Sequence, residues 1–180
     1  MFHPYFHIEL ALSEYGFFNI SRQNYIGFSL KFVLLGVGYH SPELAEVKQK
    51  IQNLHIEDNI MLMPWVSHGD CMEYVRRSSF YLSTAINEGL PLAVIEAMSV
   101  GKAIIASNVV GNKHCVKNGI NGYLLPLIVN DFADKIIELA QNDELRDKMG
   151  KKSRELFVNE FFIKNRIHLL QEKYENVCSQ

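Results

Sequence analysis

Two glutamates, Glu88 and Glu96, lie eight positions apart in the stretch STAINEGLPLAVIEAMSVGKAIIAS, which spans residues 83–107. The apolar run before Glu88 is typical of a buried strand, and the segment from Pro91 onward is typical of a helix. Pro91 suits the first turn of that helix, because the amide hydrogen that proline lacks would have no partner there. Ligands of parallel sheets bind at the carboxyl ends of the strands. We therefore expect a binding site where this strand ends and the helix begins.

The residue types around this turn predict what it binds. The amides of Leu92 and Ala93 should be free and point out of the helix end, where the helix dipole favours an anion such as a phosphate. Gly89 allows a ligand to approach the backbone closely. Glu96 lies about 7–8 Å further along the helix axis, where its carboxylate suits a vicinal diol such as that of ribose. Glu88, in the turn, would face a sugar hydroxyl at the other end of a diphosphate.

Each glutamate taken alone has a simpler interpretation. Glutamate is common in the first turn of a helix because it complements the dipole, and Glu96 alone is compatible with a solvated helix surface. The combination is more specific, because the neighbours Ile95, Ala97 and Met98 have the character of buried residues.

The rest of the chain alternates short apolar runs with helical segments of about ten residues, which is typical of right-handed βαβ units. This pattern predicts an α/β fold with a Rossmann-like parallel sheet, helices on both faces and a helical C-terminal tail. Ser67 is expected to cap one helix together with Asp70. Strands are predicted at 30–38, 59–66, 80–85, 102–109 and 122–127, and helices at 41–54, 67–79, 91–101 and from 129 onward.

Composition excludes several classes of protein. The 180 residues, 48% hydrophobic and 21% charged, fit one ordinary globular domain, and the net charge of −2 argues against a nucleic-acid binder. Cys71, Cys115 and Cys178 are too far apart in the sequence for a zinc or disulfide framework. No apolar run approaches a membrane span, and the first residues do not have the pattern of a signal peptide. We expect a cytoplasmic protein, with a peripheral position at the inner membrane face as an alternative.

The string EGLPLAVIEAMSVGKAIIAS, with KFVLLGVG upstream and NVVGNKHCVKNGINGYLLP downstream, resembles the retaining, nucleotide-sugar-dependent glycosyltransferases of the GT-B fold, family 4-like (group 1). The resemblance implies that Glu88 contacts the donor sugar at the catalytic position and that Glu96 binds the ribose. It implies no bound metal and no cofactor beyond the donor, and the chain has no Asp-x-Asp motif. The other donor-binding residues that it implies are Gly36, Gly38, Gly89, Leu90, Pro91, Leu92 and Ala93.

The resemblance also implies a domain organisation. Residues 1–160 would form a nucleotide-sugar-binding Rossmann-like domain and 161–180 a C-terminal helix, with the N-terminal acceptor domain absent. The expected function is the donor-binding half of a glycosyltransferase that moves a sugar from a UDP- or GDP-sugar to a glycan or lipid-linked acceptor, in polysaccharide or lipopolysaccharide synthesis. This chain alone should be inactive. A catalytically incompetent module that serves a partner subunit is the alternative, whereas a nicotinamide-dependent enzyme is disfavoured because GVGYHS lacks a third glycine.

Some positions depart from the family pattern. The family's first strand ends in an arginine, with a lysine about five residues later, and these positions are matched here by Met1 and Phe6. Only Arg22 and Lys31 are candidates to replace these cations, so we expect weak donor affinity. Val110 takes the place of the first of two glycines, and His114 stands where the family often has a glutamate. The remaining histidines, including His68, are interpreted as structural.

The last helix carries an apolar stripe. Ile163, Ile167, Leu170, Tyr174 and Val177 recur at intervals of three and four, which places them on one helical face. One interpretation is that the stripe packs on the domain itself. The other is that it contacts a second copy or a separate subunit, with Ile167 and Leu170 near the centre of the contact.

Overall fold

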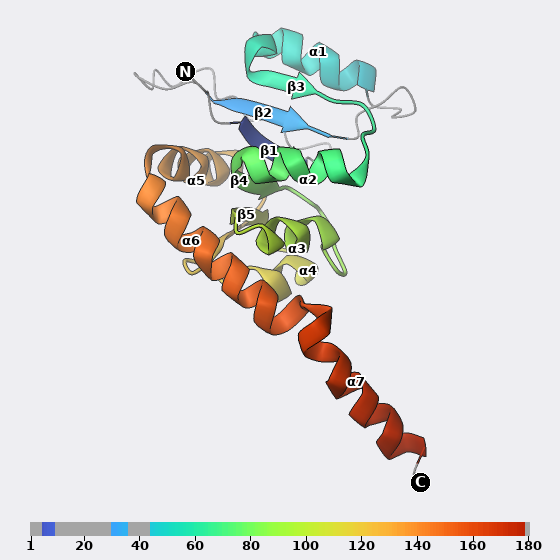
Figure 1. Ribbon diagram of the computed structural model, residues 1–180. Coiled ribbons are helices and arrows are strands. Elements are labelled where there is room, and N and C mark those ends of the chain that lie inside the picture. Colours follow the sequence, from blue (N-terminus) through green and yellow to red (C-terminus); the bar gives the residue numbers. More distant parts are fainter. Residues whose placement is uncertain (1–4, 10–29, 36–43, 179–180) are drawn as a thin grey trace.

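The computed structural model describes residues 5–9, 30–35 and 44–178, with the backbone alone described for 5–9 (Figure 1). Its core is a six-stranded sheet with the order β3-β2-β1-β4-β5-β6, and each neighbouring pair is parallel. This arrangement confirms the predicted α/β fold with a Rossmann-like parallel sheet. The strands are β1 Tyr5–Glu9, β2 Lys31–Leu34, β3 Ile60–Leu62, β4 Ser78–Ser83, β5 Ala103–Ser107 and β6 Gly122–Leu125.

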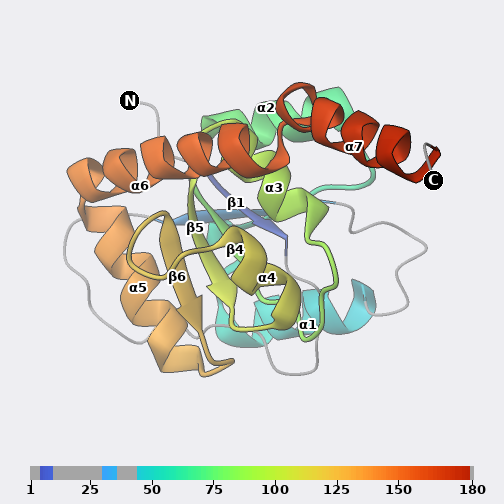
Figure 2. The same cartoon turned by 90° about the horizontal axis from the view of Figure 1, so that it is seen from below.

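Helices cover both faces of the sheet, as Figure 2 shows. The strands alternate their side chains between the two faces, so Phe80 and Leu82 of β4 pack with Phe132 and Ile136, whereas Tyr81 packs in a second cluster on the other face. The helices are α1 Leu44–Leu54, α2 His68–Arg77, α3 Leu92–Ser99, α4 Val110–Cys115, α5 Val129–Gln141, α6 Asp143–Leu156 and α7 Ile163–Cys178, with short turns η2 Glu57–Asn59 and η3 Phe157–Phe161.

The predicted elements match this order, and β2, β3, β5 and β6 are shorter than predicted. The helix α4 was not predicted, and β4 begins at Ser78, two residues before the predicted start. The segment from 129 onward is helical, as expected, but is divided into α5, α6, η3 and α7. The expected N-cap Ser41 of the first helix lies outside the described residues.

The first strand corrects the sequence-based alignment of its amino end. The strand β1 pairs with β2 from Tyr5 to Ile8 and ends at Glu9. Phe6 is therefore inside the strand and Met1 precedes it, so the placement of these two residues at the expected arginine and lysine positions is wrong. The positions beyond the carboxyl end of β1, where such cations would lie, fall outside the described residues.

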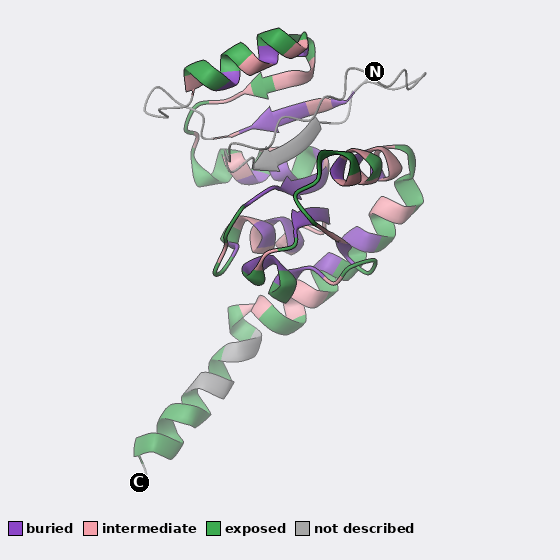
Figure 3. Cartoon of the chain, turned by 180° about the vertical axis from the view of Figure 1, so that it is seen from behind, coloured by how far each residue is buried: buried purple, intermediate pink, exposed green. Residues whose placement is uncertain are grey.

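The C-terminal helix α7 extends away from the body of the domain (Figure 1). Four members of its apolar stripe are exposed, with relative accessibilities of 63% for Ile163, 42% for Ile167, 65% for Tyr174 and 71% for Val177. Figure 3 shows this contrast with the buried sheet. The side chain of Leu170 is outside those described. For the four described members, packing on the domain's own core is therefore wrong.

Within the described part of the chain, no helix combines the length and the apolar character that a bilayer crossing requires.

Candidate functional site

The turn that holds Glu88 follows β4, at the edge of the sheet where the carboxyl ends of the parallel strands meet. Thr84 and Ala85 are buried directly after the strand, Glu88 is half-buried, and Gly89 and Leu90 are exposed. An added Cβ at Gly89 would meet no atom within 4 Å, so the space beside this backbone is open. The turn therefore presents its backbone to a ligand, as the sequence predicted.

The helix start differs in one detail from the prediction. Pro91 is the N-cap of α3 rather than its first residue, with φ −79° and ψ 82°, and the Leu92 amide donates to the Leu90 carbonyl at 2.9 Å. These values form an inverse γ-turn, which the fixed φ of proline favours. The expectation that the Leu92 amide is free is therefore wrong.

Two other amides at this helix end remain available. The first intrahelical hydrogen bond runs from the Ile95 amide to the Pro91 carbonyl at 3.0 Å. Among the described residues, the amides of Ala93 and Val94 have no hydrogen-bond partner. Ala93 was predicted and Val94 was not, although the rule that the first helical amides lack intrahelical partners could have identified it. The anion site that the helix end can form thus lies at Ala93 and Val94.

The turn is held in place by α4, which packs against its backbone. The Gly111 amide donates to the Glu88 carbonyl at 2.8 Å. A Cβ at Gly111 would lie 2.6 Å from the Glu88 oxygen, so this close approach requires glycine. Val110 begins α4 without a positive φ, so the substitution of the family's first glycine by valine causes no backbone strain here.

A buried network of hydrogen bonds holds the residues that follow β4. Ser107 Oγ donates to the Ala85 carbonyl at 2.5 Å, and Asn112 Nδ2 donates to the Ser107 carbonyl at 2.9 Å. Two buried oxygens, Thr84 Oγ1 and Asn112 Oδ1, lack a hydrogen-bond partner among the described residues. The network ties β4, β5 and α4 together, so it supports the position of Glu88.

Glu96 lies on α3, and a residue from another helix contacts it. His68 Nε2 is 2.8 Å from Glu96 Oε1, which brings the start of α2 against the middle of α3. The sequence analysis interpreted His68 as structural. The two residues are 28 positions apart, so no local pattern links them.

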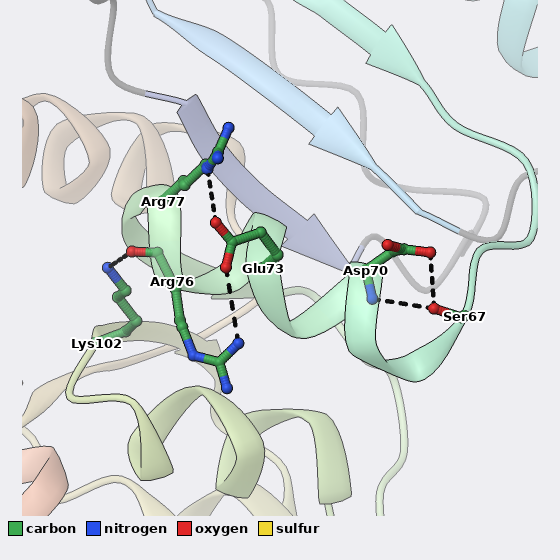
Figure 4. Close-up of polar contacts among 6 residues, drawn as sticks. All are labelled: Ser67, Asp70, Glu73, Arg76, Arg77 and Lys102. Carbon is green, nitrogen blue, oxygen red and sulfur yellow. Dashed lines mark hydrogen bonds and ion pairs between the residues drawn. The ribbon is translucent and has the colours of Figure 1, made fainter.

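The helix α2 is anchored at both of its ends (Figure 4). At the start, the predicted cap is confirmed, because Ser67 Oγ accepts from the Asp70 amide at 3.1 Å and donates to Asp70 Oδ2 at 2.7 Å. At the end, Lys102 Nζ donates to the carbonyls of Arg76 at 2.7 Å and Ser78 at 2.6 Å. Burial lowers the pKa of Lys102, partly opposed by Asp147. These contacts fix α2, and with it the backbone of His68.

The sequence profile of the glycosyl transferases group 1 matches residues 21–156, most of the chain. The chain belongs to this family. It is 30% identical over 144 residues to the UDP-Gal:alpha-D-GlcNAc-diphosphoundecaprenol alpha-1,3-galactosyltransferase of Escherichia coli, covering 79% of this chain and 36% of the relative. It is 29% identical over 136 residues to the poly(ribitol-phosphate) alpha-N-acetylglucosaminyltransferase of Staphylococcus aureus, covering 74% and 26%. The chain thus spans about a third of the length of these curated relatives.

Solved structures agree on the fold. Anabaena Alr3699/HepE in complex with UDP and glucose has a TM-score of 0.80 at 17% identity, covering 99% of this chain and 49% of that structure. A glycosyltransferase from Rickettsia africae has a TM-score of 0.81 at 20% identity, covering 98% and 48%. This group 1 chain therefore has the fold of the C-terminal half of a GT-B protein, as the resemblance implied.

The other residues considered for the site in the sequence fall into two groups, those outside the described residues and those that the structure describes. Gly36, Gly38 and Arg22 lie outside the described residues. Lys31 begins β2, and the amino end of a parallel strand is at the opposite edge of the sheet from the Glu88 turn, so Lys31 does not lie at this turn. His114 is exposed on α4. Within the described residues, no cluster of three or more His, Cys, Asp or Glu side chains could hold a metal ion.

Proposed function

We propose that this chain binds a nucleoside diphosphate sugar at the start of α3 and is the donor-binding half of a retaining glycosyltransferase. The observation that carries the proposal is the arrangement of Glu88 and Glu96 on either side of the unpartnered amides of Ala93 and Val94. An anion fits the amides, and hydroxyl-bearing groups fit the two carboxylates. A nucleotide sugar carries these groups in the same order.

Each group then has a defined role. The amides of Ala93 and Val94 donate to the diphosphate and stabilise the negative charge that grows on it as it leaves the sugar. The carboxylate of Glu96 accepts hydrogen bonds from the ribose diol. Glu88 accepts a hydrogen bond from the donor sugar at the reacting end. The open space beside Gly89 leaves room for the sugar to lie against the backbone.

The names of the relatives suggest which kinds of donor and acceptor to consider. The Escherichia coli relative is named for a UDP-sugar donor and a lipid-linked diphosphate acceptor, and the Staphylococcus aureus relative for a polymer acceptor. We propose a glycan or lipid-linked acceptor, a role in polysaccharide or lipopolysaccharide synthesis, and a cytoplasmic location that extends to the inner membrane face for a lipid-linked acceptor. Transfer requires an acceptor domain from a further polypeptide segment or a separate subunit, so this chain alone should not catalyse it.

The test is calorimetry of the purified chain with UDP, GDP and UDP-glucose. We expect Glu96→Ala to weaken nucleoside diphosphate binding by about 1.5–3 kcal/mol, the range for a hydrogen bond to a charged group. Glu88→Ala should weaken UDP-glucose binding more than UDP binding. Glu155→Ala, which removes an exposed glutamate of α6, is the charge-matched control.

Two results would contradict the proposal. If Glu88→Ala and Glu96→Ala behaved like Glu155→Ala with every ligand, the assignment of the donor site would be rejected. If the wild-type chain bound none of the three ligands at millimolar concentration, about −4 kcal/mol in free energy, a non-catalytic partner module would be favoured instead.

A further inference from the structure

The contact between His68 and Glu96 joins two helices at the proposed ribose site. A carboxylate only accepts hydrogen bonds, so Nε2 carries the hydrogen that meets Glu96 Oε1 at 2.8 Å. The side chains of His68 and Glu96 are 72% and 39% exposed. Exposed pairs of this kind contribute little to folding stability. A contribution to folding stability therefore does not explain why His68 and Glu96 are in contact, and a role in ligand binding is the better explanation.

Contacts other than the one between His68 and Glu96 hold the backbones of both residues in place. The Ser67 cap holds the start of α2, and the hydrogen bonds from Lys102 Nζ hold its end. His68 is therefore fixed at the first position of the helix. Glu96 stands on α3 between the buried Val94 and Ala97, and Ser99 Oγ donates to its backbone carbonyl at 2.6 Å. With the two backbones held, the contact at 2.8 Å restricts the rotamer of the Glu96 side chain.

The carboxylate keeps enough capacity for a ligand. Its two oxygens offer about four acceptor positions, and the imidazole occupies one of them. A vicinal diol needs two, so the contact with His68 leaves enough acceptor positions for a ribose. A long side chain that is already held also loses less rotamer freedom when the ligand binds.

We propose that His68 is a positioning residue of the nucleoside site, which acts by holding the Glu96 carboxylate in the orientation that accepts the ribose diol. This inference rests on the proposed donor-binding function and adds to it a residue from a second helix. It gives α2 a role in nucleotide binding through His68.

Calorimetry with UDP and with 2′,3′-dideoxy-UDP tests this role in three variants. We expect His68→Leu to weaken UDP binding about three- to tenfold, the range for a single hydrogen bond. His68→Gln, whose side-chain amide still donates, should recover most of the loss. Neither variant should change binding of the dideoxy nucleotide, which has no diol. His168→Leu, which alters an exposed histidine of α7, is the matched control.

A double-mutant cycle separates positioning from a general structural effect. With Glu96→Ala already present, His68→Leu should have no further effect on UDP binding. The thermal unfolding midpoint of each variant should match that of the wild type, because the pair is exposed.

Three results would overturn the positioning role while leaving the donor site intact. The first is unchanged UDP binding in His68→Leu. The second is tighter UDP binding in this variant, which would mean that the imidazole competes with the diol. The third is an equal loss of affinity for UDP and for 2′,3′-dideoxy-UDP. A wild-type chain that binds no nucleotide overturns the donor-binding function and the role of His68 with it. Sensitivity to Glu96→Ala without sensitivity to His68→Leu rejects the His68 role alone.

Discussion

Replacement of Gly111 by alanine should displace the turn that carries Glu88. A Cβ at this position would lie 2.6 Å from the Glu88 oxygen, 2.9 Å from the Glu88 carbonyl carbon and 2.9 Å from the Gly89 oxygen. All three atoms belong to the backbone, so no side-chain rotation can relieve the contact. The hydrogen bond from the Gly111 amide to the Glu88 carbonyl would be strained as well.

The expected sign of the effect depends on two opposing contributions. Alanine inside a helix is favoured over glycine by about 1 kcal/mol, so Gly111→Ala would stabilise α4 if nothing lay beside it. Overpacking against rigid atoms costs about 1–3 kcal/mol, and loss of the amide hydrogen bond costs about 1 kcal/mol more. We therefore expect the free energy of unfolding to fall by about 1–3 kcal/mol.

Urea unfolding followed by circular dichroism measures this change, and calorimetry with UDP-glucose reports the displaced turn through weaker binding. Gly89→Ala is the matched control for the unfolding measurement alone, because its Cβ would meet no atom within 4 Å and its φ is not in the left-handed region. Its free energy of unfolding should stay within about 0.5 kcal/mol of the wild type. A Gly111→Ala chain as stable as the wild type, or more stable, would refute the proposed support of Glu88 by α4.

Three further predictions concern other parts of the molecule. Thr84→Val removes a buried hydroxyl that has no partner among the described residues, so urea unfolding should show unchanged stability or a gain of up to about 1 kcal/mol, and a larger loss would reveal a partner. Burial raises the pKa of Cys115 from 9.0 to about 11, so its thiol stabilises the folded chain below about pH 9 and this stabilisation is lost as the pH rises to about 11. At pH 8, iodoacetamide should label the exposed Cys178 in the native chain and leave Cys115 unmodified, as mass spectrometry would show, and equal labelling would contradict this. The exposed stripe of α7 predicts self-association at roughly tens of micromolar in sedimentation, which the double substitution Ile163→Glu and Ile167→Glu should abolish, whereas a monomeric wild type would reject the idea.

Local sequence patterns were sufficient for most of the elements around the site. Apolar runs placed β4 and β5, because these central strands are buried on both faces, and helical spacing placed α3, which buries Val94, Ala97 and Met98 on one face. The Ser67 cap was predicted from residues three positions apart. The availability of the Ala93 amide followed from the rule for helix starts.

Short-range details that depend on exact dihedral angles were predicted less well. The γ-turn at Pro91 shifts α3 by one position and engages the Leu92 amide, and a proline in a turn is compatible with either arrangement. The alignment of Met1 and Phe6 failed because the register of a short strand is set by its neighbours β2 and β4 rather than by its own residues.

The sequence by itself determined the α/β class, the parallel sheet and the placement of Glu88 in the turn after β4 and Glu96 on the following helix, because periodicity and turn residues act over a few neighbouring positions. Only the tertiary structure brought Gly111 against Glu88 and His68 against Glu96. These contacts join residues more than twenty positions apart, and they arise because the packing of α4 and α2 against the β4 turn and α3 fixes distances that no local pattern contains. Packing therefore determines the contacts that hold the site in place, whereas local sequence patterns were enough to predict most of the groups that bind the ligand.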